Sequence, residues 1–179
     1  PLAVDLAAPG CAHPLVEWVT KRWGGLDLLV LNAAIMAKTP EGTGLAQEPP
    51  GTLERTLELN LLSPFRVATG LLPLLRASRE PRVIFVSSGA GTKSGLREPG
   101  LASYRLSKWA LNGLVLLLSK ELEGQVNVSA LDPGWVKTDM GGPNAPGSPV
   151  ESAAGALALA TAPWNQSGLL WKDGLVIDY

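Results

Sequence analysis

Short apolar runs alternate along this chain with longer segments of helical spacing. The runs Leu26–Leu31, Arg82–Val86 and Val126–Leu131 are almost unbroken apolar stretches, which is typical of strands buried on both faces of a parallel sheet. A run at Leu2–Leu6 precedes them, and Leu169–Ile177 closes the chain as a strand or a strand pair. The resulting β-α-β-α-β-α-β-α-β order predicts an α/β fold, a doubly wound parallel sheet covered by helices in three α/β/α layers.

Four segments between these runs have the features of helices. Leu15–Trp23 is apolar at helical spacing and ends in basic residues before two glycines, as helix C-termini prefer. Leu53–Leu62 and Ser103–Leu122 show the same spacing. The last helix should run from Ser148 to about Ala162, because it begins with a capping box and has proline at its first helical position.

Composition excludes several classes of protein. With 46% hydrophobic and 17% charged residues, the chain predicts a folded single domain over residues 1–179. A net charge of -1 gives no basic field for nucleic acid. The single cysteine, Cys11, excludes an internal disulfide, and the single histidine, His13, excludes a His-rich zinc site, so we expect no metal. Neither a membrane span nor a signal peptide is recognisable, which predicts a cytoplasmic protein that binds no membrane.

Small and polar residues follow three of the predicted strands. These segments are Asn32-Ala33-Ala34, Ser87-Ser88-Gly89 and Asp132-Pro133-Gly134. In a parallel sheet, ligands bind beyond the carboxyl ends of the strands, where such residues leave room for a ligand to approach the backbone. Any one segment alone is better explained by ordinary turn chemistry. Three at the same sheet edge favour a ligand site there.

A tyrosine and a lysine lie four residues apart at the start of the predicted third long helix. Tyr104 and Lys108 therefore share one helix face. A protonated lysine near a phenol favours the phenolate, and such a neighbour makes tyrosine useful as an acid or base near neutral pH. The pair alone is common and is also typical of a surface helix. Its combination with Ser88 at one strand end and Pro133-Gly134 at the next is much less common.

This combination resembles the short-chain dehydrogenase/reductase family, and the sequence is similar to its carbonyl-reductase-like branch. The resemblance covers the chain from Val4 onward and implies a Rossmann-like fold. The matching segments are Asn32-Ala33-Ala34, Asn60 within Leu59-Asn60-Leu61, Ser88, Tyr104-x-x-x-Lys108, and Pro133-Gly134 continuing to Gly142.

The resemblance implies an oxidoreductase that transfers hydride reversibly between a nicotinamide cofactor and a carbonyl or secondary alcohol. Tyr104 would be the general acid or base, Lys108 would lower its pKa and hold the nicotinamide ribose, and Ser88 would hydrogen-bond the substrate oxygen. The cofactor would be NADP or NAD, with NADP favoured by the branch. The implied catalytic residues are Ser88, Tyr104, Lys108 and Asn60, and the implied cofactor-binding residues are Asp5, Asn32, Ala33, Ala34, Tyr104, Lys108, Pro133, Gly134, Val136 and Thr138.

Two of these positions have alternative interpretations. Asp5 is equally well explained as a turn residue at a strand end, and Thr138 as the N-cap of a helix. The partner would be a small carbonyl or alcohol, and the protein a monomer or a homo-oligomer. The loops 36–50, 89–102 and 135–147 would set the substrate.

Asn60 is followed by a proline four residues later, within the predicted helix. Pro64 has no backbone N–H, so the carbonyl of Asn60 loses its helical partner. By resemblance to the family, this free carbonyl would hold a water that relays protons between Lys108 and solvent. The alternative is a helix kink that serves packing only.

The family's glycine-rich phosphate-binding turn, Thr-Gly-x-x-x-Gly-x-Gly, occurs nowhere in the 179 residues. The chain opens at Pro1 inside a strand-like run that corresponds to the family's third strand, so we expect that a segment with the N-terminal strands precedes it. If the protein does begin at Pro1, a non-catalytic relic of the fold that binds a partner protein becomes the better interpretation. A cofactor-dependent epimerase or dehydratase is a third possibility.

Overall fold

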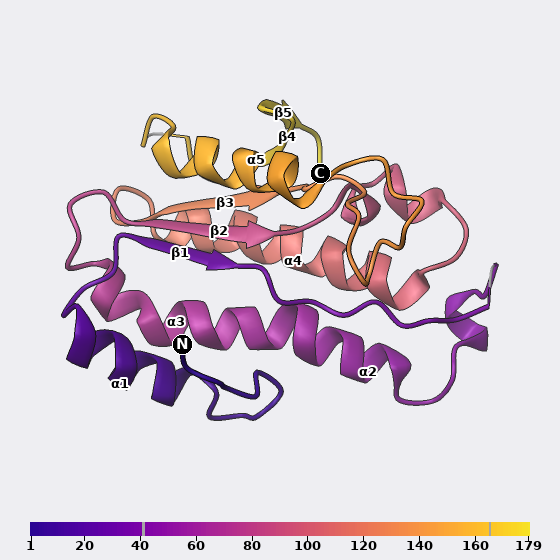
Figure 1. Cartoon of the computed structure of the whole chain (residues 1–179), viewed down its shortest axis with the longest axis horizontal. Helices are drawn as coiled ribbons and strands as arrows, with labels where there is room; N and C mark the ends of the chain where they lie inside the picture. The colour runs from indigo at the N-terminus through magenta and orange to yellow at the C-terminus, as the bar shows by residue number, and fades with distance from the viewer. Residues whose placement is uncertain (41, 165) are drawn as a thin grey trace.

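The computed structural model describes residues 1–40, 42–164 and 166–179 and has a sheet flanked by helices (Figure 1). In chain order the elements are α1 (Ala12–Arg22), β1 (Leu28–Leu31), η1 (Leu45–Gln47), α2 (Thr52–Leu57), the π-helical segment η2 (Glu58–Leu62), α3 (Ser63–Leu75), β2 (Arg82–Val86), η3 (Gly89–Gly91), η4 (Gly95–Arg97), α4 (Ala102–Glu121), β3 (Asn127–Leu131), α5 (Pro149–Thr161), β4 (Leu170–Lys172) and β5 (Leu175–Ile177).

The sheet follows the order β1-β2-β3-β4-β5. The first four strands pair in parallel, and β5 returns antiparallel to β4 through a tight turn. The predicted all-parallel sheet is therefore corrected to a mixed one. The reason is local: Asp173 and Gly174 both have positive φ, and consecutive residues of this conformation form a two-residue hairpin turn.

Helices cover both faces of the sheet, as predicted. The main core lies on the face of α3 and α4, where Val67, Leu71 and Val115 are buried with Val83 and Phe85 of β2. Helix α1 packs on the outside of α3. The opposite face is covered by α5, whose capping box is present as expected. Among the described residues, no helix combines the length and the apolar character needed to cross a membrane.

Residues 2–6 form no strand, which corrects the first expected element. A short strand is stable only when it pairs, and no described strand lies beside this segment. Leu2 and Leu6 instead line an apolar cavity of about 440 Å³ beside β1, together with side chains of α1 and α3. The apolar character of the run is therefore used in packing rather than in the sheet.

Strand β1 is the edge of the sheet, and only one of its faces is covered. Leu28 and Val30 are 37% and 40% exposed, whereas Leu29 and Leu31 pack on the main core. The prediction that this strand is buried on both faces is wrong. Helix α5 packs on β2, and among the described residues the second face of β1 stays only partly covered.

Candidate active site

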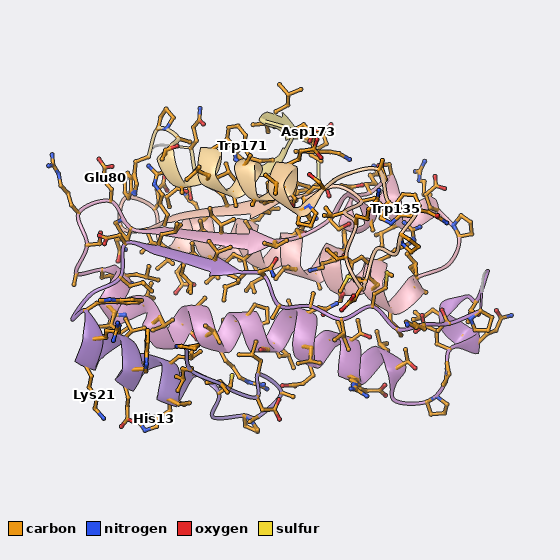
Figure 2. The ribbon with its side chains drawn as sticks, in the orientation of Figure 1. His13, Lys21, Glu80, Trp135, Trp171 and Asp173 are labelled. Atoms are coloured by element: carbon orange, nitrogen blue, oxygen red, sulfur yellow. The ribbon has the colours of Figure 1, made fainter. Side chains whose placement is uncertain are left out.

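The three predicted polar segments meet at one edge of the sheet. Strands β1, β2 and β3 run in the same direction, and the loops after them emerge at the same end of the molecule (Figure 1). Figure 2 shows Trp135, which follows β3, at this end, and Glu80, which precedes β2, at the opposite end. The first turn of α4, which carries Tyr104, lies at the carboxyl ends as well.

The strand end and the helix bring Ser88, Tyr104 and Lys108 together. Ser88 directly follows β2 and is the N-cap of η3, where its hydroxyl accepts the Ala90 N–H at 3.1 Å. Its side chain lies close enough to the Tyr104 hydroxyl to lower the pKa of that phenol. The Lys108 ammonium lies 5.7 Å from the centre of the Tyr104 ring and donates to the carbonyl of Val86 at 2.8 Å. The end of β2 therefore positions both Ser88 and Lys108 beside Tyr104.

The electrostatics of this group differ from the sequence expectation. Burial raises the pKa of Tyr104 above its ordinary value of 10.0, the Ser88 hydrogen bond opposes this rise, and the Asp132 carboxylate adds to it. Burial also lowers the pKa of Lys108 from 10.5 to about 8. In the chain by itself, desolvation thus sets the direction of the shift in the Tyr104 pKa, opposite to the lowering expected from Lys108. Tyr104 keeps its proton at neutral pH.

The lowered pKa of Lys108 predicts how stability depends on pH. Between pH 8 and 9.5 the folded chain releases this proton while the unfolded chain, with an ordinary lysine, keeps it. The unfolded state then binds more protons, so the free energy of unfolding should rise with pH by up to about 1 kcal/mol per unit. Urea unfolding at several pH values should show this rise in the wild type and in Lys93→Met, an exposed control. Lys108→Met should lose it, and parallel curves for all three proteins would contradict the assignment.

Asn60 is 1% exposed and connects two of the segments. Its side-chain amide donates to the Ile35 carbonyl and accepts the Ile35 N–H, both at 2.8 Å, and so clamps the chain that follows β1. The same amide nitrogen donates to the Ser107 hydroxyl at 3.0 Å, and this hydroxyl donates to the Tyr104 carbonyl at 2.7 Å. Asn60 thus fixes the β1 loop relative to the helix that carries Tyr104.

The helix around Asn60 is widened rather than simply kinked. Residues 58–62 form a π-helical segment between α2 and α3. Pro64, four residues after Asn60, lies in the first turn of α3. A proline without an N–H and with a ring against the preceding turn is accommodated by such a bulge, and π-bulges are frequent at functional sites. The proton relay through the Asn60 carbonyl stays a prediction.

Buried polar residues outside the expected set also support the site. The Ser87 hydroxyl donates to the Asn112 side-chain oxygen at 2.5 Å, and the Asn112 amide donates to the Gly91 carbonyl at 2.9 Å. These bonds hold η3, and with it Ser88, against α4. The signal was present in the sequence, because Asn112 follows Lys108 by one helical turn and Ser107 follows Tyr104 by three residues.

The segment after β3 is fixed by a buried carboxylate. Asp132 accepts the N–H of Gly134 at 3.0 Å and pairs with Lys172 of β4 at 3.2 Å. Gly134 has a φ of +75°, which favours glycine, and a Cβ there would meet open space. The loop thus leaves backbone accessible beyond the strand end at Pro133-Gly134.

The outer expected cofactor residues are less closely assembled. Val136 forms an isolated β-bridge with Gly147. The Thr138 hydroxyl accepts the N–H of Gly141 at 3.1 Å within a turn. The alternative role of Thr138 as a helix N-cap is wrong, because the next helix begins after Ser148. Asp5 is exposed and accepts the Ala7 N–H at 3.0 Å, the turn contact that was the alternative for this residue. Asn32, Ala33 and Ala34 follow β1, and the first two border the apolar cavity.

A sequence profile of the short chain dehydrogenase family matches residues 1–148, the greater part of the chain. The chain belongs to this family. Within it, the chain is 38% identical over 136 residues to the C-signal of Myxococcus xanthus, covering 75% of this chain and 80% of that protein.

Carbonyl reductases are also among the relatives of this short chain dehydrogenase. Carbonyl reductase [NADPH] 1 of Sus scrofa is 29% identical over 197 residues, covering 86% of this chain and 66% of that protein. The solved structure of carbonyl reductase Sniffer of D. melanogaster superposes with a TM-score of 0.90 at 29% identity, covering 99% of this chain and 77% of the other. The chain therefore spans only part of these relatives, and its fold matches theirs over almost its whole length.

Within residues 1–40, 42–164 and 166–179, no group of three or more His, Cys, Asp or Glu side chains is arranged to hold a metal ion.

Proposed function

We propose that this chain carries the substrate-side half of an NADP(H)-dependent carbonyl reductase. The observation that supports the proposal most is the convergence of Ser88, Tyr104 and Lys108 at the carboxyl ends of the strands, with Tyr104 half-buried. Relatives named carbonyl reductase [NADPH] 1 support the choice of cofactor and substrate class.

The residues present fit the nicotinamide end of such a cofactor. The small residues after β1 and the open backbone at Gly134 leave space at the sheet edge, and Lys108 offers its ammonium group there. When bound, the cofactor supplies the hydride. The glycine-rich turn that binds the pyrophosphate in the family has no counterpart in these 179 residues.

Each protein group then has one task. The Tyr104 hydroxyl gives its proton to the carbonyl oxygen as negative charge develops there. The Ser88 hydroxyl donates a hydrogen bond to the same oxygen and stabilises that charge. The Lys108 ammonium, 5.7 Å from the tyrosine ring, stabilises the phenolate that the transfer leaves behind. Asn60 is linked through the Ser107 hydroxyl to the Tyr104 carbonyl, and it fixes the position of α4 relative to the loop after β1.

A fluorescence titration tests the proposal. We expect NADPH to bind weakly or not at all to residues 1–179, and to bind when the glycine-rich N-terminal segment of a carbonyl reductase is placed before Pro1. The extended chain should then oxidise NADPH in the presence of aromatic or aliphatic carbonyls. An extended chain that folds, binds NADPH and reduces none of a broad carbonyl panel would overturn the proposed activity.

A second candidate function has a specific observation in its favour. The relative that is 38% identical is named C-signal, and the chain covers 80% of it, more than the 66% of the pig carbonyl reductase. We therefore propose, as the second candidate, a role in which the fold binds a partner protein without turnover. The titration separates the two, since this role predicts that neither form binds NADPH or NADH.

A further inference from the structure

Two loops meet over the first turn of α4. The first loop comprises residues 42–51, before α2. The second comprises residues 87–101, between β2 and α4. They come together at their ends, where a Cβ on Gly100 would lie 3.8 Å from the backbone nitrogen of Gly42. Ser103 and Arg105, the neighbours of Tyr104 in the chain, are each bonded to one of these loops.

The first loop is fastened by Glu48. Its carboxylate accepts the backbone N–H of Ser103 at 3.0 Å and also the Ser103 hydroxyl, and Ser103 is almost fully buried. The helix has no cap of its own, because its N-cap residue is Leu101, with a φ of 54° and no side-chain bond. Glu48 thus supplies from the loop both the missing acceptor and a negative charge at the positive end of the helix dipole.

The second loop is fastened by Arg105. Its guanidinium donates to three backbone carbonyls, those of Gly100 at 2.8 Å, Gly95 at 2.7 Å and Pro99 at 3.3 Å. Gly100 and Leu101 both have positive φ, a conformation that a leucine adopts only when its surroundings hold it. One side chain therefore holds the whole segment that leads into the helix.

We propose that Glu48 and Arg105 are positioning residues that fix these two loops as the walls of the substrate pocket beside Tyr104, and so determine which carbonyl compounds reach it. The inference rests on the proposed function for its substrate. Neither side chain contacts the reacting atoms. When the pocket wall is already ordered, substrate binding does not have to include the entropic cost of ordering it. Loss of either contact therefore weakens substrate affinity more than it slows proton transfer.

Amide hydrogen exchange on the 179-residue chain tests the two contacts without any turnover. Glu48→Ala should speed exchange about tenfold in residues 42–51 and at Ser103, and Arg105→Met should do so in residues 95–101, because each opening frees one loop only. Glu54→Ala and Arg97→Met, exposed and without side-chain bonds in the described structure, are the matched controls. Exchange that is unchanged in these loops, or faster throughout the chain, would overturn the proposal.

Steady-state kinetics of the extended, active form tests the consequence. Each variant should raise KM for a bulky carbonyl roughly three- to tenfold and leave kcat within about twofold. Glu48→Gln keeps an oxygen that accepts the Ser103 N–H and should recover part of the loss. An unchanged KM, or a fall confined to kcat, would contradict the positioning role. If the extended form has no reductase activity, the proposed function fails, and the exchange experiment still decides whether the two residues hold the loops.

Discussion

Replacing Tyr104 with phenylalanine is expected to lower kcat for carbonyl reduction by about a thousandfold, because the substitution removes only the proton donor. NADPH binding and the fold should be retained, since phenylalanine keeps the half-buried ring and its contact with Lys108. The measurement is single-substrate kinetics of the extended form, with a fluorescence titration of NADPH alongside.

The chain offers a matched control for this variant in its only other tyrosine. Tyr179 donates to the carbonyl of Gly168 at 3.0 Å, next to the segment that leads into β4 and not at the carboxyl ends of β1 and β2. Tyr179→Phe should therefore keep kcat. If Tyr104→Phe retains activity within tenfold of the wild type, Tyr104 is not the general acid.

A methyl group at Gly91 is expected to damage both stability and activity. A Cβ there would lie 2.4 Å from the backbone carbon of Lys108 and 2.6 Å from its Cβ, so η3 and α4 must move apart. Gly91→Ala should lower the free energy of unfolding by about 3 kcal/mol. Reduction should also fall sharply, because Ser88 is the N-cap of η3 and moves with it. Urea unfolding and kcat of the same variant measure the two effects.

The same helix provides the opposite case. Gly113 lies inside α4, and a Cβ there would meet nothing within 4 Å. Gly113→Ala should raise the free energy of unfolding by about 0.5–1 kcal/mol, since alanine loses less backbone entropy in a helix. Destabilisation by both variants to the same extent would show that the close approach at Gly91 is not what matters.

Local sequence signals predicted most helices and strands, but not the surroundings of each. The strand Arg82–Val86 and the capping box at Ser148 were predicted correctly because they depend on nearby residues alone. Two predictions were wrong in one respect each. Leu2–Leu6 was expected to be a strand and pairs with none, and the strand within Leu26–Leu31 was expected to be buried on both faces and is partly exposed on one. Both depend on whether another element lies alongside, and periodicity carries no information about that.

The candidate site shows the same division. Ser88, Tyr104 and Lys108 were predicted from their places after a strand and on one helix face, and the structure brings them together. The roles that the family resemblance implies for them stay proposals. Asp5 was predicted as a cofactor residue or, equally, as a turn residue; the structure shows the turn contact, and its role toward a cofactor stays a prediction.

The sequence by itself determined which residues of this chain are next to one another in a helix or strand. It fixed the spacing of Tyr104 and Lys108 on one face, because a helical turn is the same in every protein. Only the tertiary structure decided how far each group is from water. Burial of α4 against η3 and β3 raised the pKa of Tyr104 and lowered that of Lys108, and no local pattern specifies the amount of protein around a charge. It also placed Glu48 on Ser103, 55 residues away in sequence, since a contact of this range depends on the path of the whole chain.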